Sequence, residues 1–275
     1  MLRPDTEKLW HRLRDERALD GFILVGGTAL SMHLNHRLSE DLDFMYLGKK
    51  LPRERLDLLR RILAAEGIDL QSNDSPLGVE EFEQAGYDLR DFQQDFIASG
   101  TVKVTFVAPE PESARQLEPV SGPGPRVASL AEIFRLKCIV AADRSKTRDW
   151  FDLYLMLKQE LFQPVDIFNA FVRSGAPSKF DIAMMRLCSG VPGVNDEGYE
   201  SLMSDPPSIK DMRDYFIVVR REAEKAAARA AMPAPEAPAA GEVVGVSPEN
   251  DAPTQPAAAE VGPTAKSKAS RRRKI

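Results

Sequence analysis

The stretch GFILVGGTALSMHLNHRLSEDLDF, residues 21–44, decides the fold of this chain. A short apolar run leads directly into Gly26 and Gly27, a segment of helical composition follows, and Asp41 and Asp43 close the stretch with one leucine between them. This order predicts a buried strand, a glycine turn, a helix and a second strand that carries the carboxylates. Because side chains two apart on a strand project from the same face, Asp41 and Asp43 can share one cation.

The chemistry that this arrangement favours is phosphoryl chemistry. Mg²⁺ takes a few hard oxygens from protein and the rest from substrate phosphates. Glycines at the start of a helix leave backbone N–H groups bare for an approaching triphosphate, so Gly26, Gly27 and Thr28 are candidate phosphate-binding residues. Thr28 has a structural alternative, which is to cap the helix. No Gly-Lys-Ser/Thr and no third spaced glycine follow, so the stretch is neither a P-loop nor a dinucleotide fingerprint.

The rest of the first half alternates between helical and strand patterns. Helices are expected at 5–20, 28–35 and 52–65, and strands at 22–25, 41–46, 92–97 and 101–108. Residues 70–88 are ambiguous. Together these elements predict an α/β or α+β domain with a mixed sheet over residues 1–125.

The second half changes character after a proline-rich connection at 109–126. Helices without intervening strands are expected at 129–142, 148–160, 165–172, 179–187 and 209–230. They predict a helical bundle over 126–230 that contributes to the active-site cleft. Residues 231–275 are rich in alanine and proline and are predicted to be a disordered tail. The basic end of that tail is either a solvated terminus or a tether for nucleic acid.

Composition restricts the class of protein further. The chain has 275 residues and a net charge of −5, which argues against a strongly basic nucleic-acid binder. Cys138 and Cys188 are far apart in helical segments, so two reduced thiols are expected rather than a disulfide. No secretory leader opens the chain and no apolar run is long enough to span a bilayer. We therefore expect a cytoplasmic protein without membrane contacts.

Two blocks of sequence resemble a known family. The first is the Gly-Gly turn followed by HRLSEDLD, residues 36–43, and the second is Leu136-Lys137 followed by RDWFDLY, residues 148–154. The first block resembles the signature of the DNA polymerase β nucleotidyltransferase superfamily. Both blocks, in this order, are more closely similar to the AbiEii/AbiGii-type nucleotidyltransferase toxins.

The resemblance implies an enzyme that moves a nucleoside monophosphate from an NTP to an acceptor hydroxyl with Mg²⁺ or Mn²⁺. The implied acceptor is RNA, with a tRNA 3′ end as one candidate. The implied context is the toxin of a toxin–antitoxin or phage-defence system, with a cognate antitoxin protein as partner. Its implied catalytic residues are Asp41, Asp43, Lys137, Asp149 and Asp152, of which the aspartates at 41 and 43 bind metal. The implied nucleotide-binding residues are Gly26, Gly27, Thr28, Arg37, Ser39 and Lys137.

Several of these residues have structural alternatives. Lys137 falls on the apolar stripe of its helix, so its ammonium needs an ion-pair partner, a route to solvent, or a triphosphate. Asp149 and Asp152 share one helix face, and Arg148, Lys146 and Lys137 are candidate ion-pair partners of Asp149. The residues do not decide which of the two acids is catalytic.

Polar residues in and after the first block also have more than one interpretation each. Ser39 can hydrogen-bond a neighbouring amide, bind phosphate, or be modified as a control. His36 and Arg37 are candidates for either structural or phosphate contacts, since an arginine fork suits oxyanions. Arg53, Arg55, Arg60 and Arg61 lie on one predicted helix, which is either a solvated face or a contact for acceptor phosphates.

One position departs from the superfamily pattern. The expected strand at 102–107 has Thr105, beside Lys103, where many polymerase β-like enzymes place a third carboxylate. The third acid is then absent or supplied elsewhere, for instance by Asp149 or Asp152. This argues against efficient two-metal polymerisation and leaves open the transfer of a single nucleotide. It also leaves two alternatives, a catalytically weak member that binds nucleotide or partner as a regulator, and a transferase acting on a small molecule such as an antibiotic.

Overall fold

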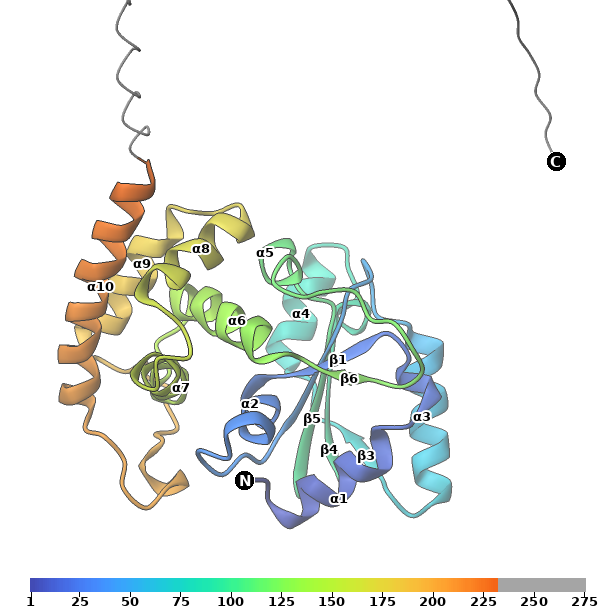
Figure 1. Ribbon diagram of the computed structural model, residues 1–275. Helices are drawn as coiled ribbons and strands as arrows, with labels where there is room; N and C mark the ends of the chain where they lie inside the picture. Colours follow the sequence, from blue (N-terminus) through green and yellow to red (C-terminus); the bar gives the residue numbers. More distant parts are fainter. Residues whose placement is uncertain (232–275) are drawn as a thin grey trace, which may run out of the picture. The chain divides into compact units, whose positions relative to one another are not determined.

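A mixed sheet and a group of helices make up the part of the chain that the computed structural model describes, residues 1–231 (Figure 1). The strands are β1 (Phe22–Val25), β2 (Leu42–Tyr46), β3 (Leu70–Ser72), β4 (Gln93–Ala98), β5 (Val102–Val107) and β6 (Arg126–Val127). The helices are α1 (Pro4–Leu13), α2 (Gly26–Leu34), α3 (Arg53–Ala65), α4 (Pro76–Gln84), α5 (Pro111–Ala114), α6 (Leu130–Asp143), α7 (Thr147–Lys158), α8 (Pro164–Ser174), α9 (Lys179–Ser189) and α10 (Ile209–Ala231). Short 3₁₀ turns lie at Arg17–Leu19, Leu89–Asp91 and Glu200–Leu202.

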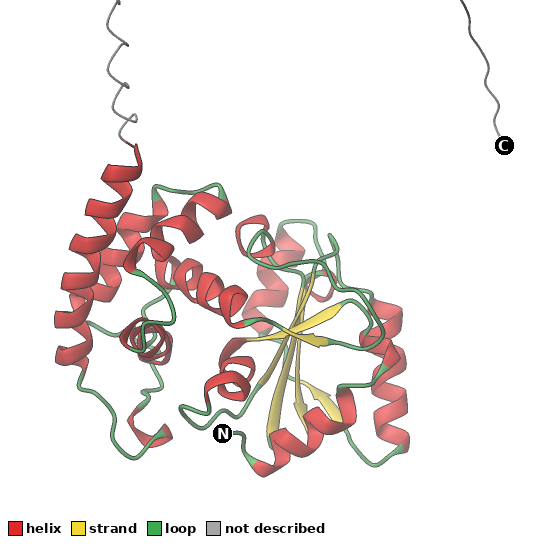
Figure 2. Cartoon of the chain, viewed as in Figure 1, coloured by secondary structure: helices red, strands yellow, loops and turns green. Residues whose placement is uncertain are grey.

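The sheet has the strand order β3-β4-β5-β2-β1-β6. The β2–β5 and β1–β6 pairs are parallel, whereas β1–β2, β3–β4 and β4–β5 are antiparallel. The mixed sheet predicted for the first half is therefore confirmed. Figure 2 shows the strands gathered in one part of the molecule and helices on both sides of them.

One face of this sheet is apolar and forms the core with α1 and α3. Phe44 of β2 stacks on Phe106 of β5 at 5.4 Å between ring centroids, and Trp10 of α1 lies 6.3 Å from Phe44. Leu59 and Leu63 of α3 are fully buried in the same core. Because side chains alternate along a strand, the residues between these aromatics project from the opposite face, which is free to carry polar groups.

The helices after β6 pack around α6. This helix begins with a capping box, in which Ser129 and Glu132 each accept from the other's backbone N–H. It packs against α7, α8 and α9, while α10 covers the other side of these three helices, and α2 connects the group to β1. The predicted helical bundle is confirmed, and residues 1–231 lie within one compact unit. A domain boundary at residue 126 stays a prediction.

Four local expectations were wrong. The helix expected at 5–20 ends at Leu13, because the Glu16 side chain accepts from the Ala18 N–H and starts a separate 3₁₀ turn. The helix expected from Thr28 already begins at Gly26, and the strand expected from Asp41 begins one residue later. The connection at 109–126 contains α5 and the first residue of β6, a strand too short to leave a pattern in sequence.

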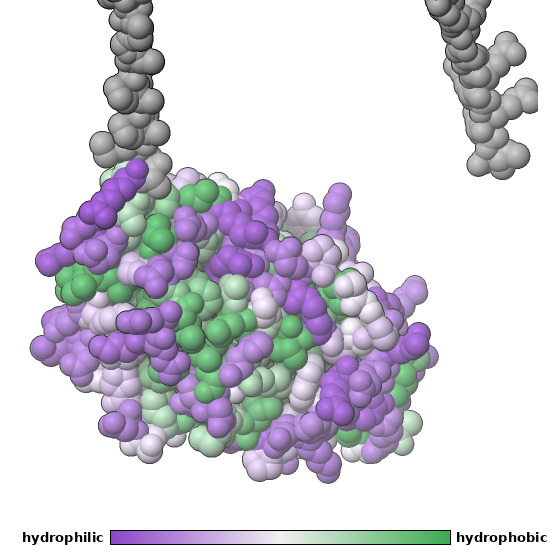
Figure 3. Space-filling model, in the orientation of Figure 1, coloured by the Kyte–Doolittle hydropathy of each residue, from purple (hydrophilic) through white to green (hydrophobic). Residues whose placement is uncertain are grey.

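Four further expectations concern the segment 70–88, the two cysteines, membrane spans and the tail. The ambiguous segment 70–88 contains β3 and α4, and Cys138 and Cys188 are separate thiols. No helix within residues 1–231 combines the length and apolar character needed to cross a bilayer. The predicted disordered tail and its basic end lie outside the described residues. On the face seen in Figure 3, apolar and polar side chains are interspersed. Exposed apolar residues of the described part of the chain include Val172, Met185 and Val218 of α8, α9 and α10.

Candidate active site

Gly26 and Gly27 form the turn at the start of α2, and a side chain would meet a close contact at either position. Gly26 has a φ of +73°, in the left-handed region, and a Cβ there would lie 2.5 Å from Oδ2 of Asp43. A Cβ on Gly27 would lie 2.5 Å from Nη2 of Arg37 and 3.2 Å from Oγ of Ser39. The two glycines therefore let the polypeptide approach a carboxylate and a guanidinium closely, at the positive end of the α2 dipole.

Asp41 and Asp43 lie beside this turn with their charges uncompensated by hydrogen bonds. Asp43 pairs in the sheet with Val25 of β1 and Thr105 of β5. Burial, and then the charge of Asp41, raise the pKa of Asp43 to about 6. Burial also raises the pKa of Asp41, against the opposing charge of Lys103. No donor within residues 1–231 hydrogen-bonds to either carboxylate side chain.

This donor set fits a hard divalent cation. Two half-buried carboxylates with raised pKa values are the oxygen ligands that Mg²⁺ and Mn²⁺ prefer, and a cation would relieve their repulsion. No cluster of three or more metal-ligating side chains occurs among residues 1–231, so a cation here would complete its coordination with water and substrate oxygens.

Thr28 holds the carboxylate pair in place. Its hydroxyl donates to the backbone carbonyl of Asp41 and is 2.8 Å from Oγ of Ser39. Thr28 is 1% exposed and does not cap α2, whose N-cap is Val25. The capping role considered for Thr28 was therefore wrong, because the helix starts two residues earlier than expected. The Ser39 hydroxyl bonds Thr28 rather than a neighbouring amide.

A buried network of ion pairs lies beneath the pair. Asp152 is completely buried and accepts from Arg37 through Nε at 2.8 Å and Nη2 at 3.0 Å. His36 Nε2 lies 2.9 Å from the same carboxylate, and Lys137 Nζ lies 2.7 Å from it. Lys137 also donates to Asp149 at 2.6 Å, and Arg144 donates to Asp149 at 2.9 Å.

The charges in this network outweigh the cost of burying them. Burial alone would raise the pKa of Asp152, but Lys137 and Arg37 hold it well below its usual range. Burial would likewise raise the pKa of Asp149, which Lys137 and Arg144 lower. Burial opposes charge on Lys137, yet Asp149 and Asp152 raise its pKa, so the ammonium stays protonated. Burial lowers the pKa of His36.

A pocket of about 210 Å³ opens above the network and is lined almost entirely by charged side chains. Its lining consists of Gly27, Arg37, Ser39, Glu40, Asp41, Asp43, Lys103, Lys137, Arg144, Lys146, Arg148, Asp149 and Glu197. The structure thus brings together the predicted site residues except Gly26, Thr28 and Asp152. Gly26 adjoins the pocket through Asp43, Thr28 lies behind Asp41, and Asp152 lies beneath Arg37 and Lys137.

Sequence reasoning missed part of the pocket lining. Lys146 and Arg148 were considered as partners of Asp149, but each instead lies 3.3 Å from Glu197. Arg144, which takes the place beside Asp149, lies with Lys146 in the short α6–α7 connection, and Arg148 follows in the first turn of α7. A cluster of three cations next to the second block is a signal that could have identified this side of the pocket. Glu197 lies in a loop after α9 and had no such signal.

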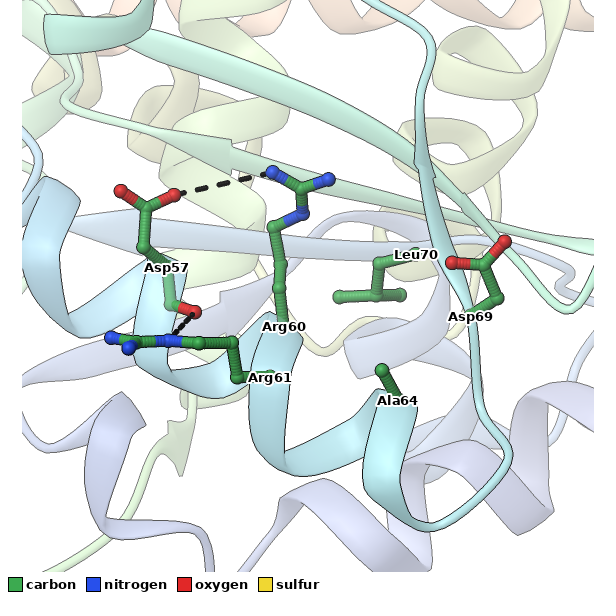
Figure 4. A pocket seen from close by; sticks show the side chains of 6 residues that line it. All are labelled: Asp57, Arg60, Arg61, Ala64, Asp69 and Leu70. Atoms are coloured by element: carbon green, nitrogen blue, oxygen red, sulfur yellow. Dashed lines mark hydrogen bonds and ion pairs between the residues drawn. The ribbon is translucent and has the colours of Figure 1, made fainter.

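The arginines of α3 do not line the pocket, and they contact carboxylates and backbone carbonyls of the protein itself. Arg53 pairs with Asp88 at 2.6 Å, and Arg55 donates to backbone carbonyls of the turn after α1. Figure 4 shows Arg60 and Arg61 beside a separate depression, where Arg60 lies 4.0 Å from Asp57 and Arg61 Nε donates to the Asp57 carbonyl at 3.3 Å. These contacts favour the interpretation of α3 as a structural helix with a solvated face.

Comparison with known proteins agrees with the predicted family. Among solved structures, a candidate nucleotidyltransferase from H. pylori is 21% identical, with 81% of this chain and 96% of that chain covered and a TM-score of 0.45. The Megavirus polyadenylate synthase is 14% identical over 55% of this chain and 30% of that chain, with a TM-score of 0.37. No curated protein matches the sequence. Residues 8–237 match the family of AbiEii nucleotidyl transferase toxins of type IV toxin–antitoxin systems, so the chain belongs to that family and is a nucleotidyltransferase.

Proposed function

We propose that this protein transfers a nucleoside monophosphate from an NTP to a hydroxyl of RNA, in a reaction that depends on Mg²⁺ or Mn²⁺. The observation that carries the proposal is the charged pocket, in which two carboxylates without hydrogen-bond donors face a group of lysines and arginines. A triphosphate needs cationic contacts for its oxygens and a metal site at its reacting phosphate, and the pocket has groups suited to both.

Three groups of residues would hold the triphosphate. The backbone N–H groups at Gly26 and Gly27 would contact phosphate oxygens at the start of α2. Lys103, Arg144 and the two cations that follow it, Lys146 and Arg148, lie around the pocket and would bind the remaining oxygens. Lys137 would place its ammonium beside the triphosphate, because its ion pairs with the buried Asp149 and Asp152 keep it protonated and fix its position.

The metal site would be Asp41 and Asp43. A divalent cation bound there would supply Lewis-acid stabilisation of charge on the attacked phosphate. In the transfer, the acceptor oxygen forms a bond to the α-phosphorus, the bond from that phosphorus to the bridging oxygen breaks, and pyrophosphate leaves. The cations of the pocket would offset the charge on the departing pyrophosphate.

The two acids of the second block would have different roles. Asp149 lines the pocket and orients Lys137 and Arg144 toward it. Asp152 is buried below and would act by fixing Arg37, which in turn lies against Gly27 and lines the pocket. We therefore propose that Asp149 is the acid of this block that acts in the pocket, by orienting Lys137 and Arg144. Asp152 would have a structural role, by fixing Arg37 from below the pocket. The sheet part at 1–125 would supply the metal ligands, and the helical part at 126–230 would supply most of the cations.

Family membership supports RNA as the acceptor and growth inhibition as the result, with a cognate antitoxin protein as partner. The cations Lys146 and Arg148, at the pocket edge, would also suit a polyanionic acceptor. A small-molecule acceptor and nucleotide binding without turnover are the competing outcomes.

Labelling with each α-³²P NTP tests the proposal. The full chain is incubated with Mg²⁺ and total RNA, and Asp41→Ala is compared with the matched control Asp181→Ala, whose side chain is 74% exposed and far from the second block in sequence. We expect labelled RNA with the wild type and the control, and none with Asp41→Ala. Nucleotide binding without label in any acceptor would contradict transfer and leave a binding module.

A further inference from the structure

A row of three residues crosses the polar face of the sheet from the proposed metal pair outward. Asp43 of β2 is the register partner of Thr105 of β5, and Thr105 is the register partner of Asp95 of β4. Partners in register project from the same face, and neighbouring strands are about 4.8 Å apart. The row therefore places a hydroxyl directly beside Asp43 and a further carboxylate one strand beyond it.

Hydrogen bonds fix the orientation of this row. The Thr105 hydroxyl donates to Oδ1 of Asp95 at 2.7 Å, so its oxygen can still accept a hydrogen bond from another group. Gln93 Nε2 donates to Oδ2 of Asp95 at 2.6 Å, and Lys103 Nζ lies 4.0 Å from Oδ1. Asp43 and Lys103 line the active-site pocket, and Thr105 and Asp95 follow next to it on the same face of the sheet, outside the lining.

Asp95 is unusual for a carboxylate in a sheet. It is 8% exposed, although a buried acid costs stability unless its charge is compensated. Its partners are one hydroxyl, one amide and a lysine at the limit of ion-pair distance, which is weak compensation beside the arginine and lysine pairs that hold Asp152. Asparagine would also offer Thr105 an acceptor oxygen, without the cost of a buried charge.

We propose that Thr105 contacts the acceptor hydroxyl and that Asp95 is the positioning residue behind it, which receives the proton released in transfer. The proposal rests on the proposed function and names the side of the pocket from which the acceptor enters, across β5. The missing carboxylate at position 105 is thereby supplied one strand away through a hydroxyl.

The proposed step transfers two protons and one nucleotidyl group, and it conserves atoms and charge. The acceptor O–H hydrogen-bonds to a Thr105 lone pair, its proton passes to the Thr105 oxygen, and the original Thr105 proton passes to the Asp95 carboxylate. The freed electron pair of the acceptor oxygen forms the bond to the α-phosphorus, and pyrophosphate leaves with the electrons of the broken P–O bond. Thr105 ends the step unchanged, and Asp95 ends it as a neutral acid that solvent can deprotonate.

Substitutions separate this relay from a structural role. Asp95→Asn keeps an oxygen that can accept from Thr105 but cannot take a proton, and Thr105→Val removes the hydroxyl at nearly constant shape. General-base catalysis typically contributes about 100-fold or more, so each variant should lower kcat about 100-fold with KM for the NTP unchanged. Thr105→Ser restores the hydroxyl and should restore kcat to within about threefold. Asp181→Ala serves as the matched control, with kcat near the wild-type value, because its carboxylate is 74% exposed and does not line the pocket.

The measurement is steady-state transfer of an α-³²P NTP to RNA by the full chain, with thermal unfolding of each variant recorded alongside. The inference is overturned if Asp95→Asn and Thr105→Val transfer at the wild-type rate, or if their losses appear only in KM for the NTP. A wild-type protein that labels no RNA would overturn the proposed function and this inference together. Labelling that both variants retain would overturn this inference alone.

Discussion

The charge of Asp43 should destabilise the folded protein at neutral pH, and Asp43→Asn should therefore stabilise it. Its pKa rises from the ordinary value of 3.8 to about 6 on folding. Each pKa unit corresponds to about 1.4 kcal/mol, so ionised Asp43 costs about 3 kcal/mol of unfolding free energy. Removing the charge should recover most of this cost, which corresponds to a rise in Tm of about 6–12 °C for a domain of this size.

The sign of the pH dependence follows from proton binding. Because the pKa is higher in the folded state, folding takes up a proton between about pH 4 and pH 6. The contribution of protonated Asp43 to stability is thus present below about pH 4 and is lost as the pH rises through about 6. The advantage of Asp43→Asn over the wild type should be full at pH 8 and should disappear toward pH 4.

Urea unfolding followed by circular dichroism, from pH 4 to pH 8, measures this difference. Asp181→Asn is the matched control, because its carboxylate is 74% exposed and should contribute little at any pH. Mg²⁺ should raise the Tm of the wild type at pH 8 and should leave Asp43→Asn unchanged, since the cation relieves the repulsion that the variant lacks. The reasoning is refuted if Asp43→Asn gains nothing at pH 8, or if its gain is as large at pH 4.

Three further predictions concern the surroundings of the carboxylate pair. Asp152→Ala should lower the unfolding free energy by about 3–5 kcal/mol, because it leaves buried cations unpaired; urea titration checks this, and a loss below about 1 kcal/mol contradicts it. Gly27→Ala should weaken NTP binding measured by calorimetry, since its Cβ would lie 2.5 Å from Arg37 Nη2, and wild-type affinity would contradict the close approach. Arg144→Ala should raise the Kd for NTP about tenfold by fluorescence titration, whereas an unchanged Kd would exclude a phosphate contact.

Local pattern was enough to predict the core of the site. The glycine turn and the Asp41/Asp43 pair lie within one short stretch, and a strand that pairs with its neighbour after a single helix has few alternative placements. The position of Lys137 on an apolar stripe correctly indicated that its ammonium needs partners. Roles for these residues in catalysis stay predictions.

Contacts between residues that are distant in the sequence could not be predicted from local sequence patterns. Arg37 and Asp152 are 115 residues apart in the sequence, and no local pattern predicts which aspartate this arginine will bind. The row from Asp43 to Asp95 depends on the register of two strand pairs, and a shift of one residue would turn Asp95 to the opposite face. The placement of β6 failed for a different reason, since two residues carry no periodicity.

The central claim is that the pocket around Asp41 and Asp43 adds nucleotides to RNA, and sequencing of RNA 3′ ends tests it most directly. Total RNA is incubated with the full chain, Mg²⁺ and all four NTPs, in parallel with Asp41→Asn. We expect RNA ends extended by added nucleotides with the wild type, and unextended ends with an Asp41→Asn variant whose Tm is no lower. Extension by both proteins, or by neither while pyrophosphate is still released, would contradict it.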